Sequence, residues 1–423
     1  NDVNGQISQF IPFGGTLNIS LDTYKSSTTQ NYQTWNPRYY STLRFDFSQP
    51  LLQNFGLDIS KKEIIIARKG LESSLAQTEL AMMNTIYSAE QAYWNLVYAI
   101  EDLKVKQESL KLARELLAKN QKSVEIGTLA PLDVLSAQSE VATREADIIR
   151  AEVAVKNAED QLWVMMNIPD EEKKQYTSIE PFDLPKIEQK AMSLEEAESL
   201  ALESRPDLRN LRVSADTQLF NLKVAKNQLL PALNLVASYY SPGLSGNRLV
   251  YQDNNPLTGI VVDVIPGPRS QSLKDSFRFK YDNWSVGLTL NIPLGNAISR
   301  AGVAQARLNL QQAELNLQQQ EQQAKLEVKT ALRTVEANLH SVEAYKAARV
   351  LQEQKLAAEE EKLKVGQSTN YTVLQYQRDL SAARSSELKA IIDYNISVAN
   401  LDKILGISLK NRNIKLMDME DSN

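Results

Sequence analysis

The chain of 423 residues carries a formal net charge of −5 at neutral pH, and 23% of its residues are charged, so nothing in its charge balance favours a nucleic-acid partner. It contains no cysteine, which excludes disulfides, thiolate metal sites and a lipidated cysteine within these residues. Glycine and proline are sparse, at 15 and 14, which favours long helices over a compact mixed fold. Because no uninterrupted run of about 18 apolar residues occurs, we predict no transmembrane helix.

Residues 1–52 are predicted to form a first pair of β-strands, because apolar and polar side chains alternate along two segments. Alternation of this kind places the apolar side chains on one face of a sheet. The apolar members are Leu17, Ile19, Leu21, Leu43, Phe45 and Phe47.

Residues 53–168 are predicted to form a first long helical hairpin, because apolar side chains recur at every seventh position, as in a left-handed coiled coil. A helix from about residue 61 to 125 would run roughly 95 Å. The tip that follows it is Gly127, Thr128, Leu129, Ala130 and Pro131, where glycine suits a helix end and proline a first helical turn. The recurring residues are Leu96, Leu103, Leu110, Leu117 and Val124 before the tip, and Val134, Val141, Ile148, Val155 and Leu162 after it.

Residues 169–231 are predicted to contain a linker and the helices of a second repeat, with helix from about Ser193 to Leu230. Residues 232–294 are predicted to form a second strand pair with a long external loop at 242–280. The alternating apolar residues of this pair are Leu233, Leu235, Trp284, Val286, Leu288, Leu290 and Ile292.

The strand pattern alone fits a soluble sheet with one wet face as well as it fits a sheet in a bilayer. Three features favour the bilayer. A polar loop joins each strand pair at one end, and the chain continues into helix at the other. Each strand has roughly ten residues, which is enough to cross a bilayer at a tilt. Aromatic residues also gather at the strand ends, as in an interfacial girdle. These aromatics are Tyr39, Tyr40, Tyr239, Tyr240 and Trp284.

Residues 295–406 are predicted to form a second long helical hairpin, which an internal repeat relates to the first. The interval from Gly127 to Gly366 also separates Ser60 from Ser299, so we interpret the two copies as a duplication. The alternative is a chance similarity between two helical segments rich in Gln and Ala. The second tip is Gly366, Gln367, Ser368 and Thr369, and either Ser368 or Thr369 could cap the next helix. The heptad residues are Val335, Val342, Leu356, Leu363, Val373, Leu380, Tyr394 and Leu401, interrupted by Arg349 and Glu387.

Four strands cannot close a barrel, and open sheet edges are not tolerated in lipid. Oligomerisation would have to supply the missing strands. Three copies would give twelve strands and twelve long helices, which would close a β-barrel and an α-barrel together.

With this order of elements the sequence resembles the TolC-like outer-membrane efflux proteins, the outer membrane factor family. The resemblance rests on the duplicated hairpins, the strand endings Gln49-Pro50-Leu51 and Ile292-Pro293-Leu294, and the sequence from Arg205 to Leu208. It implies a mixed α and β fold, in which long coiled-coil helical hairpins form a periplasmic α-barrel. This barrel is continuous with an antiparallel transmembrane β-barrel, built from four strands per protomer in a trimer.

The resemblance also implies the site and the partners. The two tips would dock a periplasmic adaptor (membrane fusion) protein joined to an inner-membrane transporter, while the strands contact outer-membrane lipid. Residues 169–190 and 407–423 would pack as an equatorial belt. No cofactor and no metal site are expected. The chain would act in the cell outer membrane, with a long periplasmic extension.

Two departures from the family pattern stand out. The first repeat lacks the helix that precedes the strands of the second, so we expect an N-terminus that is processed or truncated. Some family members also close the periplasmic end with aspartate rings, six and nine residues after the second turn glycine. Here these positions are Thr372 and Gln375, and only Asp133, the match in the first hairpin, is acidic. The gate region is therefore predicted to comprise Asp133, Thr372 and Gln375, without the familiar paired carboxylates.

The function hypothesis is a passive export duct of a tripartite efflux or type I secretion system. The alternative is a periplasmic coiled-coil adaptor or structural protein, which would need compact β-rich domains beside a single hairpin. An enzyme is a third possibility, but no motif supports one. His340 is the only histidine, and no nucleophile, metal cluster or phosphate loop accompanies it.

Overall fold

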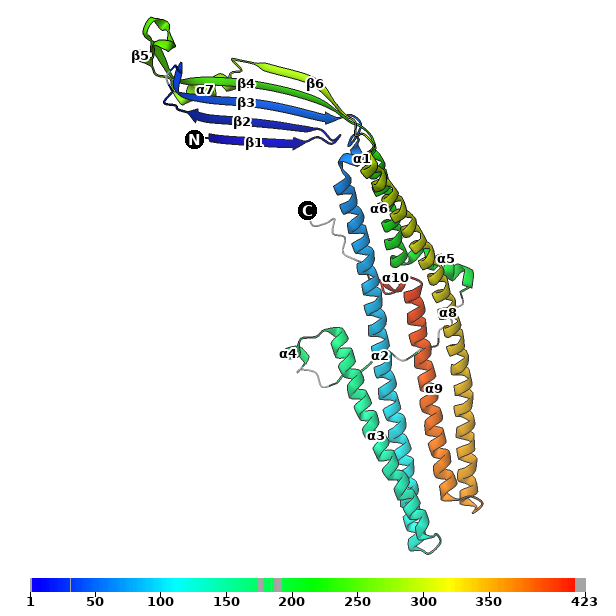
Figure 1. The fold of residues 1–423 in the computed structure, drawn as a ribbon. Coiled ribbons are helices and arrows are strands. Elements are labelled where there is room, and N and C mark those ends of the chain that lie inside the picture. Colours follow the sequence, from blue (N-terminus) through cyan, green and yellow to red (C-terminus); the bar gives the residue numbers. More distant parts are fainter. Residues whose placement is uncertain are drawn as a thin grey trace. The chain divides into compact units, whose positions relative to one another are not determined.

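The computed structural model describes residues 2–30, 32–173, 178–183, 185, 187 and 192–414. The chain divides into two compact units, Asn1–Glu72 with Val213–Leu315, and Ser73–Arg212 with Asn316–Asn423. Figure 1 shows that the first unit carries an antiparallel sheet, whereas the second consists of helices. Within the described residues no helix is both long and apolar enough to cross a membrane.

The sheet has the strand order β1-β2-β3-β4-β5, and β6 also pairs with β4. One edge of β4 pairs with β3. The other edge is long enough for two partners, because β6 pairs with the first half of β4 and β5 with its last four residues. The outer strands β1 and β6 are exposed along their whole length. The strands are β1 (Asp2–Phe10), β2 (Thr16–Ser26), β3 (Trp35–Pro50), β4 (Ala232–Tyr251), β5 (Val261–Ile265) and β6 (Asn283–Asn291).

The register of the sheet gathers the predicted apolar residues on one face. Leu21 lies opposite Leu43, and Phe45 lies opposite Tyr239, which in turn faces Trp284. Since side chains alternate along a strand, these residues share a face, and their neighbours in sequence share the other. We call the first face the apolar face. It comprises Leu17, Ile19, Leu21, Leu43, Phe45, Phe47, Leu233, Leu235, Ala237, Tyr239, Trp284, Val286, Leu288 and Leu290.

The four predicted strands correspond to β2, β3, β4 and β6, and the sheet contains two more, β1 and β5. In β1 only Val3 and Ile7 are large and apolar ahead of Phe10, so its alternation is weak. The segment 242–280, predicted as an external loop, is largely structured. It holds the end of β4, two short 3-10 helices, β5 and the helix α7 (Arg269–Phe277).

Helix α7 packs closely against β3 and β4 through small side chains. The Ser41 and Ser272 hydroxyl oxygens lie 2.9 Å apart, and the Ser276 hydroxyl donates to the carbonyl of Ser41 at 2.7 Å. Gly243 makes this approach possible, because a Cβ there would lie 1.9 Å from the carbonyl oxygen of Ser272. Ser41 and Gly243 face each other on the same side of the sheet as Leu43, so α7 covers one end of the apolar face.

The long helices form where the seven-residue repeats predict them. All the predicted heptad positions are buried or half-buried, so the coiled-coil prediction is confirmed. The helices are α1 (Leu57–Ser60), α2 (Lys62–Glu125), α3 (Pro131–Met166), α4 (Asp170–Lys173), α5 (Leu194–Ser204), α6 (Pro206–Asn227), α8 (Ala297–Lys364), α9 (Asn370–Ile404) and α10 (Ser408–Asn411).

The two residues that interrupt the second apolar stripe form an ion pair with each other. Arg349 on α8 contacts Glu387 on α9 through its Nε, and its Nη1 lies 2.9 Å from Glu353. Arg384 adds a contact of 3.1 Å to Glu353. Partial burial raises the pKa of Glu353, but hydrogen bonds from Arg384 and Arg349 outweigh it and leave this pKa lowered. A charged network therefore replaces one apolar layer of the hairpin.

Side-chain contacts hold the starts of helices α5 and α6. Ser193 and Glu196 form a reciprocal capping box at the start of α5. Arg205 then holds Asp207 at 2.8 Å and Glu327 of α8 at 2.7 Å, which fixes the residues before α6 against the second hairpin.

Only part of the predicted belt falls within the described residues, because 174–177, 184, 186, 188–191 and 415–423 lie outside them. In the described part, Ile179 packs against the core formed by Ala92, Leu96 and Leu162, and the backbone N–H of Asp183 donates to the Tyr93 hydroxyl at 2.9 Å. Arg412 pairs with Glu90 of α2.

Candidate functional site

The two hairpin tips have the same backbone conformation. Gly127 and Gly366 both adopt φ = 76°, a left-handed conformation that glycine tolerates best. After the first helix, Thr128 N donates to the carbonyl of Ser123 at 2.9 Å, and after the second, Gln367 N donates to that of Lys362 at 2.8 Å. Each glycine N–H also bonds the carbonyl three residues earlier. Both helices thus end in the same double hydrogen bond, which supports the duplication of the two hairpins.

The second tip is held by side-chain hydrogen bonds. The Thr369 hydroxyl accepts from the backbone N–H of Thr372 at 3.3 Å and caps α9. Ser368 has another role, because its hydroxyl donates to Glu359 at 2.6 Å. The Ser368 hydrogen bond and the ammonium of Lys362 lower the pKa of Glu359. Of the two candidates, Thr369 is therefore the residue that caps α9, whereas Ser368 ties the turn to α8 through Glu359.

Several exposed apolar residues surround the tips, and the sequence reasoning missed them. Their exposed fractions lie between 62% and 74%, whereas Leu129, the apolar residue singled out from the sequence, is half-buried. A large exposed apolar side chain that recurs at one end of a hairpin is a sign of an interaction surface. These residues are Ile126, Leu132 and Leu135 beside the first tip, and Val365 and Tyr371 beside the second.

The three residues of the predicted gate region occupy the first turns of α3 and α9. Asp133 and Thr372 are half-buried, and Gln375 is exposed. The Thr372 hydroxyl lies 2.8 Å from that of Thr369, so it is engaged in the helix cap. Within the described residues Gln375 forms no such contact, and its side chain is exposed to solvent.

An ionic cluster with a buried Glu140–Arg144 pair joins the first hairpin to α9 beyond the tips. Glu140 and Arg144 lie one turn apart on α3, at 7% and 4% exposure. The Arg144 Nε donates to Glu140 at 3.0 Å, and Arg378 of α9 donates to the same carboxylate at 2.5 Å. Sequence spacing reveals the pair on α3, but it cannot reveal the partner on α9. We call Glu140, Arg144 and Arg378 the inter-hairpin cluster.

The guanidinium of Arg144 is at the centre of this cluster. Besides Glu140 it donates to the carbonyl of Ser109 on α2 at 2.6 Å and to that of Leu374 on α9 at 3.2 Å. Burial lowers the pKa of Arg144, and the hydrogen bond and charge of Glu140 oppose that shift. A guanidinium stays charged in proteins, so one carboxylate balances a buried positive charge that three helices share.

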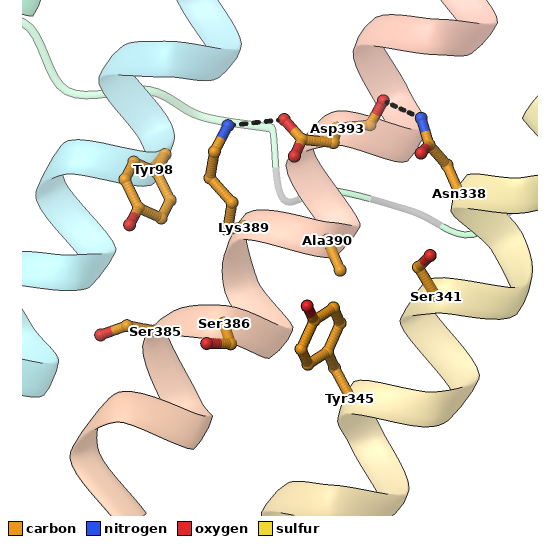
Figure 2. A pocket seen from close by; sticks show the side chains of 9 residues that line it. All are labelled: Tyr98, Asn338, Ser341, Tyr345, Ser385, Ser386, Lys389, Ala390 and Asp393. Carbon is orange, nitrogen blue, oxygen red and sulfur yellow. Dashed lines mark hydrogen bonds and ion pairs between the residues drawn. The ribbon is translucent and has the colours of Figure 1, made fainter. Parts of the chain in front are cut away.

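A polar pocket of about 380 Å³ lies between α2, α8 and α9 in the second unit (Figure 2). The Lys389 Nζ pairs with Asp393 at 2.7 Å, and the side-chain amide of Asn338 donates to the carbonyl of Asp393 at 3.1 Å. The lining residues are Tyr98, Asn338, Ser341, Tyr345, Ser385, Ser386, Lys389, Ala390 and Asp393.

The chemistry of this pocket is hydrogen bonding. Burial, Asp102 and Asp393 together raise the pKa of Tyr98, so its hydroxyl remains a neutral donor at physiological pH. Ser385 is bonded to Asp102, without a histidine to act as its base. Across the described residues no group of three or more His, Cys, Asp or Glu side chains is arranged to hold a metal ion. His340 is exposed on α8 beside Glu343.

Comparison with solved structures finds the same fold in several bacterial outer-membrane proteins. The outer membrane protein VceC of Vibrio cholerae superposes with a TM-score of 0.68 at 16% identity, covering 93% of this chain and 87% of that one. The CmeC outer membrane channel of Campylobacter jejuni gives 0.66 at 17%, covering 97% and 83%. The open state of the MtrE outer membrane channel of Neisseria gonorrhoeae gives 0.63 at 18%, covering 94% and 82%.

Sequence comparison is consistent with this fold. A search of curated proteins finds no match. A family model described as "Outer membrane efflux protein" matches residues 11–167 and 198–407, which leaves out β1, the linker with the start of α5, and the C-terminal tail. Matches over both repeats establish the relationship, and the chain belongs to the outer membrane efflux protein family.

Proposed function

We propose that this protein is a passive outer-membrane export duct, acting as a trimer in a tripartite efflux or type I secretion system. The observation that carries the proposal is the combination of one apolar sheet face with two duplicated helical hairpins. A sheet with an unpaired apolar face and two exposed outer strands needs lipid on that face and neighbouring strands at its edges. Copies of the same chain would provide those strands. The polar pocket would then contact water and solutes without catalysing a reaction.

The duct predicts a detergent-dependent trimer with a stable ionic conductance in planar bilayers. Closure at the gate region would rest on helix packing and on neutral groups at Thr372 and Gln375, while Asp133 could still contribute charge if its side chain points inward. We therefore expect modest block by divalent cations, and stronger block after Thr372→Asp combined with Gln375→Asp, since a ring of carboxylates attracts cations. A soluble monomer without detergent, or purified trimers without conductance, would argue against the duct.

We further propose that the two tips dock a periplasmic adaptor that is joined to an inner-membrane transporter. The support is the exposed apolar set around both turns, since interfaces bury such side chains at their centre. The turn residues Gly127 to Pro131 and Gly366 to Thr369 would present this set to the adaptor.

Leu132→Glu combined with Tyr371→Glu should weaken docking by about tenfold or more, because charges replace two apolar contacts. Export of a fluorescent substrate from intact cells should fall accordingly, while trimers and their conductance remain. Gln121→Glu, an exposed change at the end of α2, is the matched control and should leave export unchanged. Normal export by the double variant would mean that these tip residues are not part of the docking surface.

A further inference from the structure

The end of the apolar face carries a cluster of exposed aromatic and basic side chains. Helix α7 presents one side to the sheet, where Ser272, Asp275 and Ser276 are buried. Its other side is exposed and displays Lys274, Phe277 and Arg278. The chain then continues through Phe279, Lys280 and Tyr281 to Trp284 at the start of β6, all of them exposed. We call Lys274, Phe277, Arg278, Phe279, Lys280 and Tyr281 the α7 collar.

The collar is positively charged. Lys280 pairs with Asp275 at 3.6 Å, so that buried carboxylate is already neutralised. Lys274 and Arg278 form no ion pair with the described part of the chain. Asp282 is the other acid in this segment, and it lies at the far end from Lys274. Two cations therefore point outward next to exposed aromatic rings, with a third beside them.

The backbone places an aromatic side chain where a glycine is usual. Phe279 adopts φ = 50° at the end of α7, and the N–H of Lys280 bonds the carbonyl of Asp275 at 3.1 Å, as in a glycine-terminated helix. This conformation is unfavourable for a residue with a Cβ. The ring of Phe279 packs against Tyr239 and Phe45, with centroids 5.8 and 6.3 Å apart. The collar is thereby continuous with the apolar face.

The position of the collar matches the edge of a bilayer. From Pro50, where β3 meets the helical end of the sheet, back to Ser41 under α7, the strand covers about 30 Å. At the tilt of about 40° common in outer-membrane barrels, this is about 23 Å along the bilayer normal. The apolar band of such barrels is about 25 Å tall. Helix α7 thus lies where the hydrocarbon ends, at the end of the sheet away from the helices.

The structure also argues against a second copy of this chain as the occupant of the collar. Helix α7 packs on β3 and β4, which lie inside the strand order, whereas the outer strands are β1 on one side and β5 and β6 on the other. The collar would therefore remain exposed to the membrane around the proposed barrel. Aromatic rings with basic residues at a membrane boundary interact with the interface and with anionic headgroups.

We propose that the α7 collar binds the phosphate groups of anionic outer-leaflet lipid, with Lys274, Arg278 and Lys280 contacting the phosphates. Phe277, Phe279 and Tyr281 sit among the adjacent acyl chains and glycerol or sugar groups. The proposal rests on the membrane location given under the proposed function. Its consequence is a fixed depth of the sheet in the bilayer and a shell of retained lipid around each trimer.

The test uses the full-length trimer in mixed micelles, titrated with bis-phosphorylated lipid A or with zwitterionic phosphatidylethanolamine and followed by native mass spectrometry. We expect lipid A to bind more tightly. Lys274→Gln, Arg278→Gln and Lys280→Gln together should weaken its binding by about fivefold per cation, and so by about a hundredfold, while phosphatidylethanolamine is little affected. Phe277→Ser with Tyr281→Ser should weaken the binding of both lipids.

The matched control removes the same charge from α8, by Lys329→Gln, Lys346→Gln and Lys355→Gln, which are all exposed. The proposal is overturned if the collar variant binds lipid A as tightly as the parent does. It is also overturned if the α8 control loses as much lipid A binding as the collar variant. So does a parent that binds both lipids equally. Conductance recorded from the same preparations separates the two ideas, because a conducting trimer that ignores lipid A refutes only the collar.

Discussion

Glu140→Gln is expected to lower the free energy of unfolding of the helical unit by about 3 kcal/mol. The variant keeps the shape of the side chain and removes its charge. Arg144, at 4% exposure, then keeps its positive charge without a carboxylate in contact. Breaking a buried pair typically costs about 3–5 kcal/mol, and the lower value applies here because Arg378 can turn to solvent.

Glu145→Gln is the control, since Glu145 lies on the same helix and pairs with Arg114 at 2.6 Å while both side chains are about half exposed. Exposed pairs contribute roughly 0–1 kcal/mol, so this variant should unfold much like the parent. Thermal unfolding followed by circular dichroism, in the same detergent, measures both. Equal stabilities for the two variants would mean that the inter-hairpin cluster does not hold α3 to α9. Hydrogen exchange should show the loss at α9 as well as at α3, because Arg144 and Glu140 both contact that helix.

Gly243→Ala is expected to displace α7 from the sheet and to destabilise that end of it by about 2 kcal/mol. The added methyl group would lie 1.9 Å from a backbone carbonyl of α7, and a backbone atom cannot move aside as a flexible side chain does. Limited proteolysis of the trimer should therefore cut the segment 252–282 faster than in the parent.

Gly287→Ala provides the comparison on β6, because its methyl group would meet only Val236, at an ordinary distance of 3.9 Å. This variant should keep the parent's proteolysis pattern and lipid binding. If Gly243→Ala resists proteolysis as well as Gly287→Ala does, α7 is not anchored by close packing at Gly243. The lipid titration is an independent test of the position of α7, since a protein with a displaced α7 should also lose its preference for lipid A.

The parts of the fold that repeat regularly could be predicted from the sequence. The heptads predict which face of each long helix is buried, because a seven-residue apolar period is typical of a coiled coil. The turn glycines predict where those helices end. Even the interruptions at Arg349 and Glu387 were visible, although their pairing was not. The alternation of apolar and polar residues likewise predicted which side chains share the apolar face, because successive side chains of a strand point to opposite faces of the sheet.

The parts that depend on contacts between distant segments could not be predicted. Glu140 and Arg144 look like an ordinary helical ion pair until α9 brings Arg378 to them. Helix α7 lacks a periodic apolar pattern, because its inner side is made of serines that fit beside glycine instead of a hydrophobic stripe. The exposed apolar residues at the tips lie outside the heptad positions, and Ile126 and Val365 come just after the ends of α2 and α8. Their position in the sequence did not show whether other parts of the chain cover them, and the structure shows that they are exposed.

Strand direction has a consequence for assembly. Strands β1, β2, β3, β4 and β6 alternate in direction, so the two outermost strands, β1 and β6, run the same way. In a ring of identical copies, β6 of one copy beside β1 of the next would be a parallel pair, whereas β6 beside β2 would be antiparallel. An all-antiparallel ring therefore requires β1 to give up its place beside β2. Until then β1 covers an edge that would otherwise be free to pair with any exposed strand.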